Sequence, residues 1–185
     1  ENFAKDAITV SVDIDPAEIG KNISISASVT GDIKDVLTAL MRQMNATEHP
    51  DWRKLVQKFK NDEKRLCQFP TNRLHPYAVI SKLQALADDN TAIVTDVGQH
   101  QMWTAQRYDF AKPRNFVTSG GLGAMGFGMG AAIGSCFGKQ KKKTVLITGD
   151  GSFHMNLNEL ATAVTHNLPI VIVVMNNGVL GMVRQ

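Results

Sequence analysis

Two short polar motifs could together hold a metal ion and a diphosphate. They are Gly149-Asp150-Gly151-Ser152 and, further along, Asn176-Asn177. Asp150 offers a carboxylate oxygen and Asn177 an amide oxygen, and such hard oxygens, with a backbone carbonyl and phosphate oxygens, suit octahedral Mg²⁺. Ser152 and the N–H groups that open the next helix would face anionic oxygens. The alternative is a β-α-β crossover whose glycine and asparagine turns bind nothing.

The segments around these motifs predict a unit of strand, helix and strand. Residues 144–148 form an apolar run typical of a short buried strand, and residues 168–175 form a second run rich in β-branched side chains. Between them, residues 153–166 carry apolar side chains at nearly helical spacing. In a parallel sheet both polar motifs lie at the carboxyl edge, where open α/β sheets bind ligands.

Composition excludes several classes of function. The chain has 185 residues, a net charge of +3 and 43% hydrophobic residues, so neither nucleic acid nor a membrane is an expected partner. The basic cluster at residues 139–143 is typical of a solvated loop. Cys67 and Cys136 lack metal-ligand spacing and suit a reducing compartment, which favours a cytoplasmic location.

The first part of the chain has a different pattern from the rest. Residues 1–45 contain alternating segments at 7–13 and 23–29, and we expect the end of a nucleotide-binding-type α/β domain. Residues 46–72 are polar and charged, with a helix expected at about 51–66, and are typical of a linker. The chain begins at Glu1 rather than Met and stops just after a turn, so we expect it to be part of a longer polypeptide.

Residues 73–185 alternate between helix and strand patterns. A helix is expected from His75-Pro76, a strand at 92–96, a short helix after Gly98, and a glycine-dense segment at 118–130 that opens a helix at 131–137. With the unit around Asp150, the order is αβαβαβαβ. This order predicts an α/β fold with a doubly wound parallel sheet.

Four groups of residues carry a resemblance to a known family. They are residues 13–20, 95–103 (Thr-Asp-Val-Gly-Gln-His-Gln-Met-Trp), 118–128 (Thr-Ser-Gly-Gly-Leu-Gly-Ala-Met-Gly-Phe-Gly), and 149–152 with 176–177 and 180–185. The chain resembles the C-terminal part of the acetohydroxyacid synthase (acetolactate synthase) catalytic subunit, a thiamine-diphosphate enzyme. The aspartate–asparagine pair is typical of thiamine-diphosphate enzymes in general, and the second and third groups narrow the match.

The resemblance assigns roles to individual residues. It implies that Asp150, Asn177 and the backbone carbonyl of Val179 bind Mg²⁺. It implies that Met125 wedges under thiamine diphosphate, so that the two rings bend towards each other and the reacting groups come close. The implied cofactor-binding residues are Gly98, Gln99, His100, Gly123, Met125, Asp150, Gly151, Ser152, Asn177 and Met182. A structural histidine at position 100, a core methionine at 125 and a packing role for Trp103 are the alternatives.

The resemblance also implies a second cofactor and a reaction. An FAD site in the full-length enzyme would include the positions Asp13, Ile14, Glu18, Gly31, Asp32 and Ile33. The alternative is a strand and turn whose acids have no ligand. The enzyme condenses pyruvate with pyruvate or 2-ketobutyrate in branched-chain amino-acid biosynthesis, acts as a homodimer or larger assembly, and can have a regulatory subunit.

The match has two departures. Gly130 stands where the family usually has proline, which adds backbone freedom. The family's activating glutamate lies in a domain outside this chain, so no catalytic residue is assigned here, and we expect the isolated chain to form no 2-acetolactate. Two other functions stay open at this point: another thiamine-diphosphate decarboxylase or oxidase of 2-oxo acids, and a non-catalytic binding module.

Overall fold

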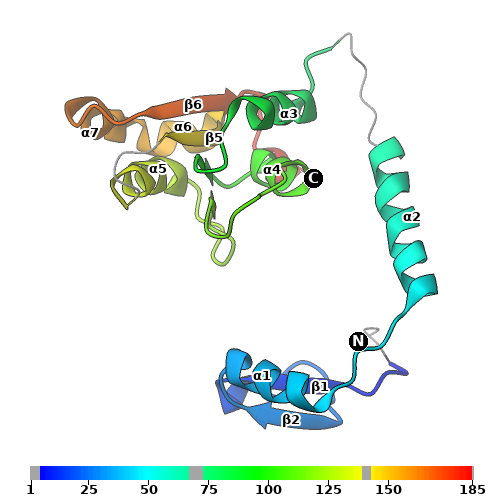
Figure 1. Ribbon diagram of the computed structural model, residues 1–185. Coiled ribbons are helices and arrows are strands. Elements are labelled where there is room, and N and C mark those ends of the chain that lie inside the picture. Colours follow the sequence, from blue (N-terminus) through cyan, green and yellow to red (C-terminus); the bar gives the residue numbers. More distant parts are fainter. Residues whose placement is uncertain (1–4, 67–72, 139–142, 185) are drawn as a thin grey trace. The chain divides into compact units, whose positions relative to one another are not determined.

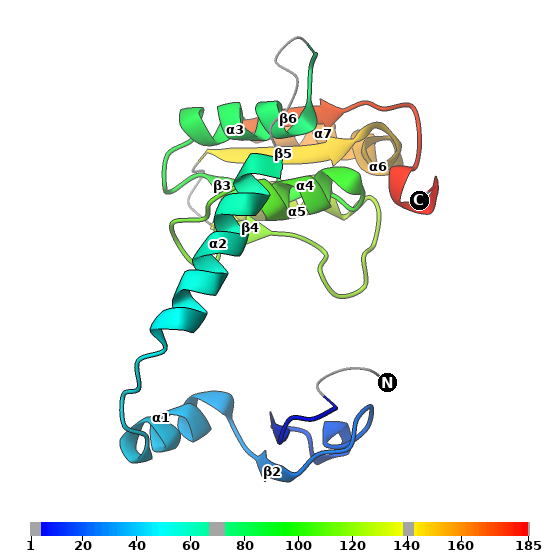
Figure 2. The same cartoon turned by 90° about the vertical axis from the view of Figure 1, so that its right-hand side faces the viewer.

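The computed structural model describes residues 5–66, 73–138 and 143–184 (Figures 1 and 2). The chain divides into two units, Glu1–Leu66 and Cys67–Gln185. This division falls inside the predicted linker at residues 46–72, while the assignment of the domains stays a prediction. Cys67 and the basic residues 139–142 lie outside the described residues.

The second unit is built on a four-stranded sheet. Its strands are β3 (Ala92–Thr95), β4 (Phe116–Val117), β5 (Thr144–Gly149) and β6 (Ile170–Met175). They lie in the order β4-β3-β5-β6, and every pair is parallel. All residues of β5 are buried, as its continuous apolar pattern indicates for a central strand covered on both faces.

Helices cover both faces of this sheet (Figure 1). Their bounds are α3 (Pro76–Leu86), α4 (Gln99–Arg107), α5 (Phe127–Gly138), α6 (Asp150–Asn156), α7 (Leu160–Thr165) and α8 (Gly181–Arg184). On one face, Leu146 packs with Met129 of α5 and Ala163 of α7. On the other face, Ile147 belongs to a core cluster against which Leu83 of α3 packs. The prediction of a doubly wound α/β fold is confirmed.

Two predicted helices have different bounds in the structure. The segment 153–166 is divided into α6, a 3-10 helix at Leu157–Glu159, and α7, and α6 begins three residues earlier than predicted. The break lies at Asn156, whose side chain donates a hydrogen bond to the carbonyl oxygen of Gly126. The helix predicted at 131–137 begins at Phe127, because a distant carboxylate accepts hydrogen bonds at its start, as described below.

The first unit is smaller. It contains β1 (Val10–Asp13), a 3-10 helix at Pro16–Glu18, β2 (Ala27–Thr30), α1 (Ile33–Gln43) and α2 (Pro50–Leu66). The two strands are parallel and shorter than predicted, because their pairing covers only the register from Val10 with Ala27 to Asp13 with Thr30. Asp32 caps α1 by accepting a hydrogen bond from the Lys34 N–H.

Among the described residues, no helix combines the length and apolar character needed to span a bilayer.

Candidate binding site at the carboxyl edge of the sheet

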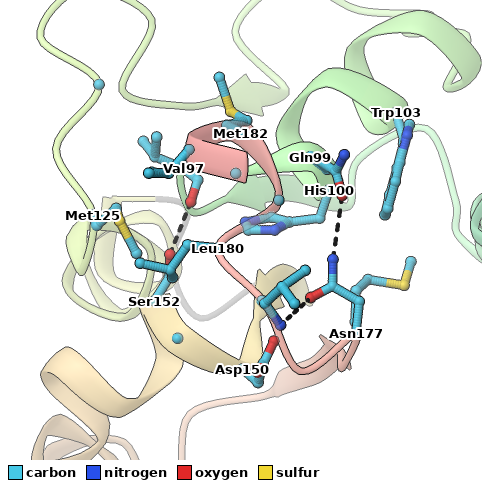
Figure 3. Close-up of a pocket in the computed structure, with 18 residues that line it drawn as sticks. Val97, Gln99, His100, Trp103, Met125, Asp150, Ser152, Asn177, Leu180 and Met182 are labelled. Carbon is cyan, nitrogen blue, oxygen red and sulfur yellow. Dashed lines mark hydrogen bonds between the residues drawn. The ribbon is translucent and has the colours of Figure 1, made fainter. Parts of the chain in front are cut away.

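A pocket lies where β3, β5 and β6 end (Figure 3). It is lined by residues from four separate stretches of the sequence, within 97–103, 123–125, 149–152 and 175–183. Because the strands are parallel, their carboxyl ends meet at one edge, and the loops that follow them converge there. Every position that the sequence assigned to the diphosphate cofactor or its metal lines this pocket.

Asp150 and Asn177 enter the pocket from neighbouring strands. Asp150 directly follows β5, and Asn177 follows β6, so both lie on the same side of the pocket (Figure 3). The Asn177 amide is oriented by two hydrogen bonds: its oxygen accepts from the Val179 N–H at 3.1 Å, and its nitrogen donates to the Gln99 side chain at 3.2 Å. An amide oxygen has two lone pairs, so one is left for a ligand.

The donor set at this position fits a magnesium ion that is shared with a phosphate. Within the described part of the chain, no three His, Cys, Asp or Glu side chains are grouped to hold a metal by themselves. The pocket instead offers one carboxylate, one amide oxygen and the backbone at Val179. Mg²⁺ is usually held in this way, by one or two carboxylates with substrate phosphates and water completing its octahedron.

His100 lies in the wall of the pocket as a buried, neutral group. Its side chain is 4% exposed, and Nε2 has no hydrogen-bond partner within the described residues. Burial lowers the pKa of His100, and this effect outweighs the opposing influence of Asp96 and Asp150. A buried polar atom without a partner needs a ligand or water. The Nε2 atom of His100 therefore fits a role in binding.

Gly98 allows His100 to take this position. Its φ of +154° is rarely adopted by other residues, and a Cβ atom there would lie 2.6 Å from Cε1 of His100. Any side chain at position 98 would therefore displace the imidazole ring.

Ser152 contributes differently from the expectation. Its side chain is buried, and its hydroxyl donates a hydrogen bond to the Val97 carbonyl oxygen at 2.8 Å (Figure 3). The hydroxyl proton is therefore already used to join the start of α6 to the end of β3. A contact with diphosphate from Ser152 stays a prediction and now depends on its backbone N–H and its free lone pair.

The opposite side of the pocket is apolar. Met125 and Gly123 from the loop before α5, and Met182 from α8, line it as predicted from the resemblance. Leu180 and Trp103 also line the pocket. From the sequence, Leu180 was noted only as the first residue of the 180–185 motif, and a packing role was the alternative weighed for Trp103.

The six positions predicted for FAD lie in the first unit, apart from this pocket. The ends of β1 and β2 bring two of them together, since the Gly31 N–H donates to the Asp13 carbonyl oxygen at 2.9 Å. The carboxylates of Asp13, Glu18 and Asp32 make local hydrogen bonds within their own turns. Ile14 and Ile33 are exposed. The FAD site stays a prediction.

Comparison with known proteins defines the class of this chain. Residues 96–185 match the family described as thiamine pyrophosphate enzyme, C-terminal TPP binding domain. This segment contains α4 to α8 and all residues that line the pocket. This segment therefore belongs to the C-terminal TPP-binding domains of thiamine pyrophosphate enzymes.

Within that class, the chain is similar over its whole length to acetolactate synthases, which confirms the resemblance found in its motifs. It is 42% identical to the acetolactate synthase isozyme 1 large subunit of Escherichia coli and 38% identical to a probable large subunit of Methanococcus aeolicus. It is 45% identical to the chloroplastic acetolactate synthase 1 of Nicotiana tabacum. All of this chain is covered in each comparison, but it spans only 33%, 34% and 29% of those relatives' lengths.

Proposed function

We propose that the pocket binds thiamine diphosphate together with Mg²⁺. The proposal is supported by one observation above all: four stretches of sequence, each with a different chemical character, line a single pocket. Asp150, Asn177 and the Val179 carbonyl hold the metal. The backbone of Gly98, Gln99 and Gly151, with Ser152 and Nε2 of His100, holds the diphosphate. Gly123, Met125 and Met182 hold the organic part of the cofactor.

The protein orients the cofactor, and the cofactor carries the chemistry. When bound, thiamine diphosphate supplies a carbon nucleophile towards 2-oxo acids. The chain's own contribution is positional: Met125 enters the apolar side of the pocket, while the polar groups at the strand ends lie on the other side. A cofactor held at both ends has its rings fixed in one arrangement, which raises the rate by proximity.

We further propose that the whole protein is an acetolactate synthase, which condenses pyruvate with pyruvate or 2-ketobutyrate. The similarity to acetolactate synthase large subunits supports this proposal. It implies an enzyme that forms homodimers or larger assemblies and can have a regulatory subunit, while the cysteine pattern favours a cytoplasmic location. It also implies that residues 1–45 contribute to an FAD site, that residues 46–72 are a linker and that residues 73–185 form the cofactor domain.

The metal assignment is tested by removing the carboxylate at the end of β5. We expect Asp150→Ala to abolish Mg²⁺-dependent binding of thiamine diphosphate in titration calorimetry, because only one carboxylate lines the pocket. The exposed Asp109 serves as the control, and Asp109→Ala should bind as the unaltered chain does. Equal binding by Asp150→Ala and the unaltered chain would show that the metal site is wrongly assigned.

A further inference from the structure

The carboxylate of Asp96, at the end of β3, is engaged by the loop that precedes α5. Its Oδ1 accepts a hydrogen bond from the Gly126 N–H at 2.9 Å, and its Oδ2 accepts from the Gly128 N–H at 2.8 Å. The side chain is fully buried, with 2% of the residue exposed. A buried carboxylate that accepts from backbone N–H groups makes strong, charge-assisted hydrogen bonds. Asp96 therefore fixes the start of α5 from thirty residues away in the sequence.

The carbonyl group of the same residue, Gly126, is fixed by Asn156. Its Nδ2 donates to the Gly126 carbonyl oxygen at 2.6 Å, although Asn156 belongs to the last turn of α6. The N–H of Gly126 is thus held by Asp96, directly after β3, and its carbonyl oxygen is held by Asn156 of α6. Both partners belong to elements that begin or end at the pocket.

Close packing at Gly128 shows that these hydrogen bonds require a residue without a side chain at this position. A Cβ atom on Gly128 would lie 2.7 Å from Oδ2 of Asp96 and 2.9 Å from a methyl group of Leu146. The carboxylate can approach the two N–H groups only because position 128 has no side chain. The two hydrogen bonds of Asp96 therefore depend on glycine at position 128.

We propose that Asp96 and Asn156 are positioning residues that hold Met125 in the pocket. Met125 directly precedes Gly126, so fixing both peptide groups that flank Gly126 restricts the direction in which the methionine side chain leaves the backbone. This inference rests on the proposed binding of thiamine diphosphate. In this proposal, Asp96 and Asn156 control how the organic end of the ligand is held, although neither residue lines the pocket.

These hydrogen bonds lie near the organic end of the proposed ligand and not near its diphosphate end. The N–H groups of Gly126 and Gly128 are already bonded to Asp96, so the start of α5 has these donors in use. The groups assigned to the metal that is shared with the diphosphate, Asp150 and Asn177, make none of these contacts. Loss of the Asp96–Asn156 clamp should therefore weaken recognition of the organic end and leave recognition of the diphosphate intact.

Hydrogen exchange tests the clamp without any ligand. In Asn156→Ala, we expect faster amide exchange in the peptide covering residues 119–128, with β5 unchanged. Asn158→Ala is the matched control, because Asn158 is exposed nearby and its side-chain amide bonds only to Glu159 in the described structure. Exchange at residues 119–128 equal to that of the unaltered chain would overturn the proposal.

Calorimetry with two probes tests the role in binding. In the presence of Mg²⁺, we expect Asn156→Ala and Asp96→Asn to weaken thiamine diphosphate binding by about tenfold or more, since each loses a hydrogen bond that fixes the loop. For Asn156→Ala, binding of inorganic diphosphate should change by less than about twofold, because Asn156 bonds to Gly126 and not to the groups assigned to the diphosphate. Equal weakening for both probes would overturn the proposal, since general unfolding of the pocket has that effect.

The two proposals fail in different ways. If the unaltered chain binds inorganic diphosphate but not thiamine diphosphate, the proposed function is wrong, and the exchange measurement alone decides on the clamp. If Asp96→Asn does not fold, Asn156→Ala carries both measurements.

Discussion

The chemistry of His100 depends on its surroundings more than that of any other pocket residue. Its ring lies against Gly98 and Gly149, where Cβ atoms would come within 2.6 Å and 3.0 Å of it. Water is excluded from the ring, which favours the neutral imidazole, and the nearby carboxylates of Asp96 and Asp150 only partly oppose this. An imidazole held neutral, with Nε2 lacking a protein partner, is prepared to accept or donate one hydrogen bond to a ligand.

This environment predicts a pH dependence of stability. The unfolded chain binds a proton at His100 below about pH 6.5, whereas the folded chain resists that proton because its pKa is lowered. The free energy of unfolding should therefore be fully retained above about pH 6.5 and should fall as the pH is lowered from there towards the folded-state pKa. His100 contributes at most one proton to this slope, about 1.4 kcal/mol per pH unit.

The measurement is urea unfolding at several pH values between 5 and 8. In His100→Gln, the loss of stability between about pH 6.5 and 5 should be smaller than in the unaltered chain, because one differential proton is removed. His154→Gln, at an exposed histidine, is the control and should keep the original slope. An unchanged slope in His100→Gln would show that the ring is accessible to protons in the folded state.

Residue types identified Asp150 and Asn177 as metal candidates and Ser152 as a diphosphate candidate, and the family resemblance added Gly98, Gln99 and His100. Asp150 and Asn177 could be proposed because hard oxygen ligands at the carboxyl ends of parallel strands suit Mg²⁺. The partner of the Ser152 hydroxyl and the role of Asp96 could not. Both depend on contacts between segments far apart in the sequence, Ser152 with Val97 and Asp96 with Gly126.

At the scale of elements, glycine has opposite effects on stability at two positions of α5. Gly134 is exposed, and a Cβ atom there would meet nothing within 4 Å. Gly128 lies against Asp96 and Leu146, where a Cβ atom would come within 2.7 Å and 2.9 Å. The first glycine weakens the helix without a packing benefit, and the second permits the clamp.

Alanine at these two positions should therefore change stability in opposite directions. Gly134→Ala should stabilise the chain by about 0.5–1 kcal/mol, because alanine loses less backbone entropy in a helix. Gly128→Ala should destabilise it by about 1–3 kcal/mol, because the core must shift to accept the methyl group. Chemical denaturation of both variants gives the two values. Destabilisation by Gly134→Ala would mean that this face of α5 is more closely packed than the structure shows.

Three of the four strands in the sheet of the second unit were predicted with their residue ranges, and β4 was not. Strands β3, β5 and β6 follow from apolar runs with β-branched residues, and their bounds differ from the prediction by no more than two residues. The helix after Asp150 was predicted to be continuous, because its apolar spacing continues through the break. Its division at Asn156 comes from the hydrogen bond to Gly126, which local spacing does not encode.

At the scale of the whole molecule, the pocket and both core clusters belong to the second unit. Every residue that lines the pocket and every member of the two clusters lies between residues 73 and 185. This unit has the buried strands β3 and β5, whereas none of the residues 5–62 is buried. The stability that the structure can account for is therefore concentrated there.

We expect a shortened chain of residues 73–185 to fold and to bind inorganic diphosphate with Mg²⁺ as the full chain does. Trp103 would be its only tryptophan, since the other is Trp52, and it lines the pocket. Its fluorescence should show a cooperative unfolding transition and should respond to the ligand. A shortened chain without cooperative unfolding would show that residues before 73 are needed for this core.

The sequence by itself determined the fold class, the family and the metal-binding candidates. Apolar periodicity specifies strands and helices locally, and groups such as Asp150 and Asn177 keep their chemistry wherever they lie. Only the tertiary structure decided which groups are still free to bind. It joined the Ser152 hydroxyl to Val97, left Nε2 of His100 without a protein partner in the described residues, and placed Asp96 and Asn156 on either side of Gly126. The physical reason is that a hydrogen bond between distant segments depends on their separation in space, which the packing of the sheet and its helices sets.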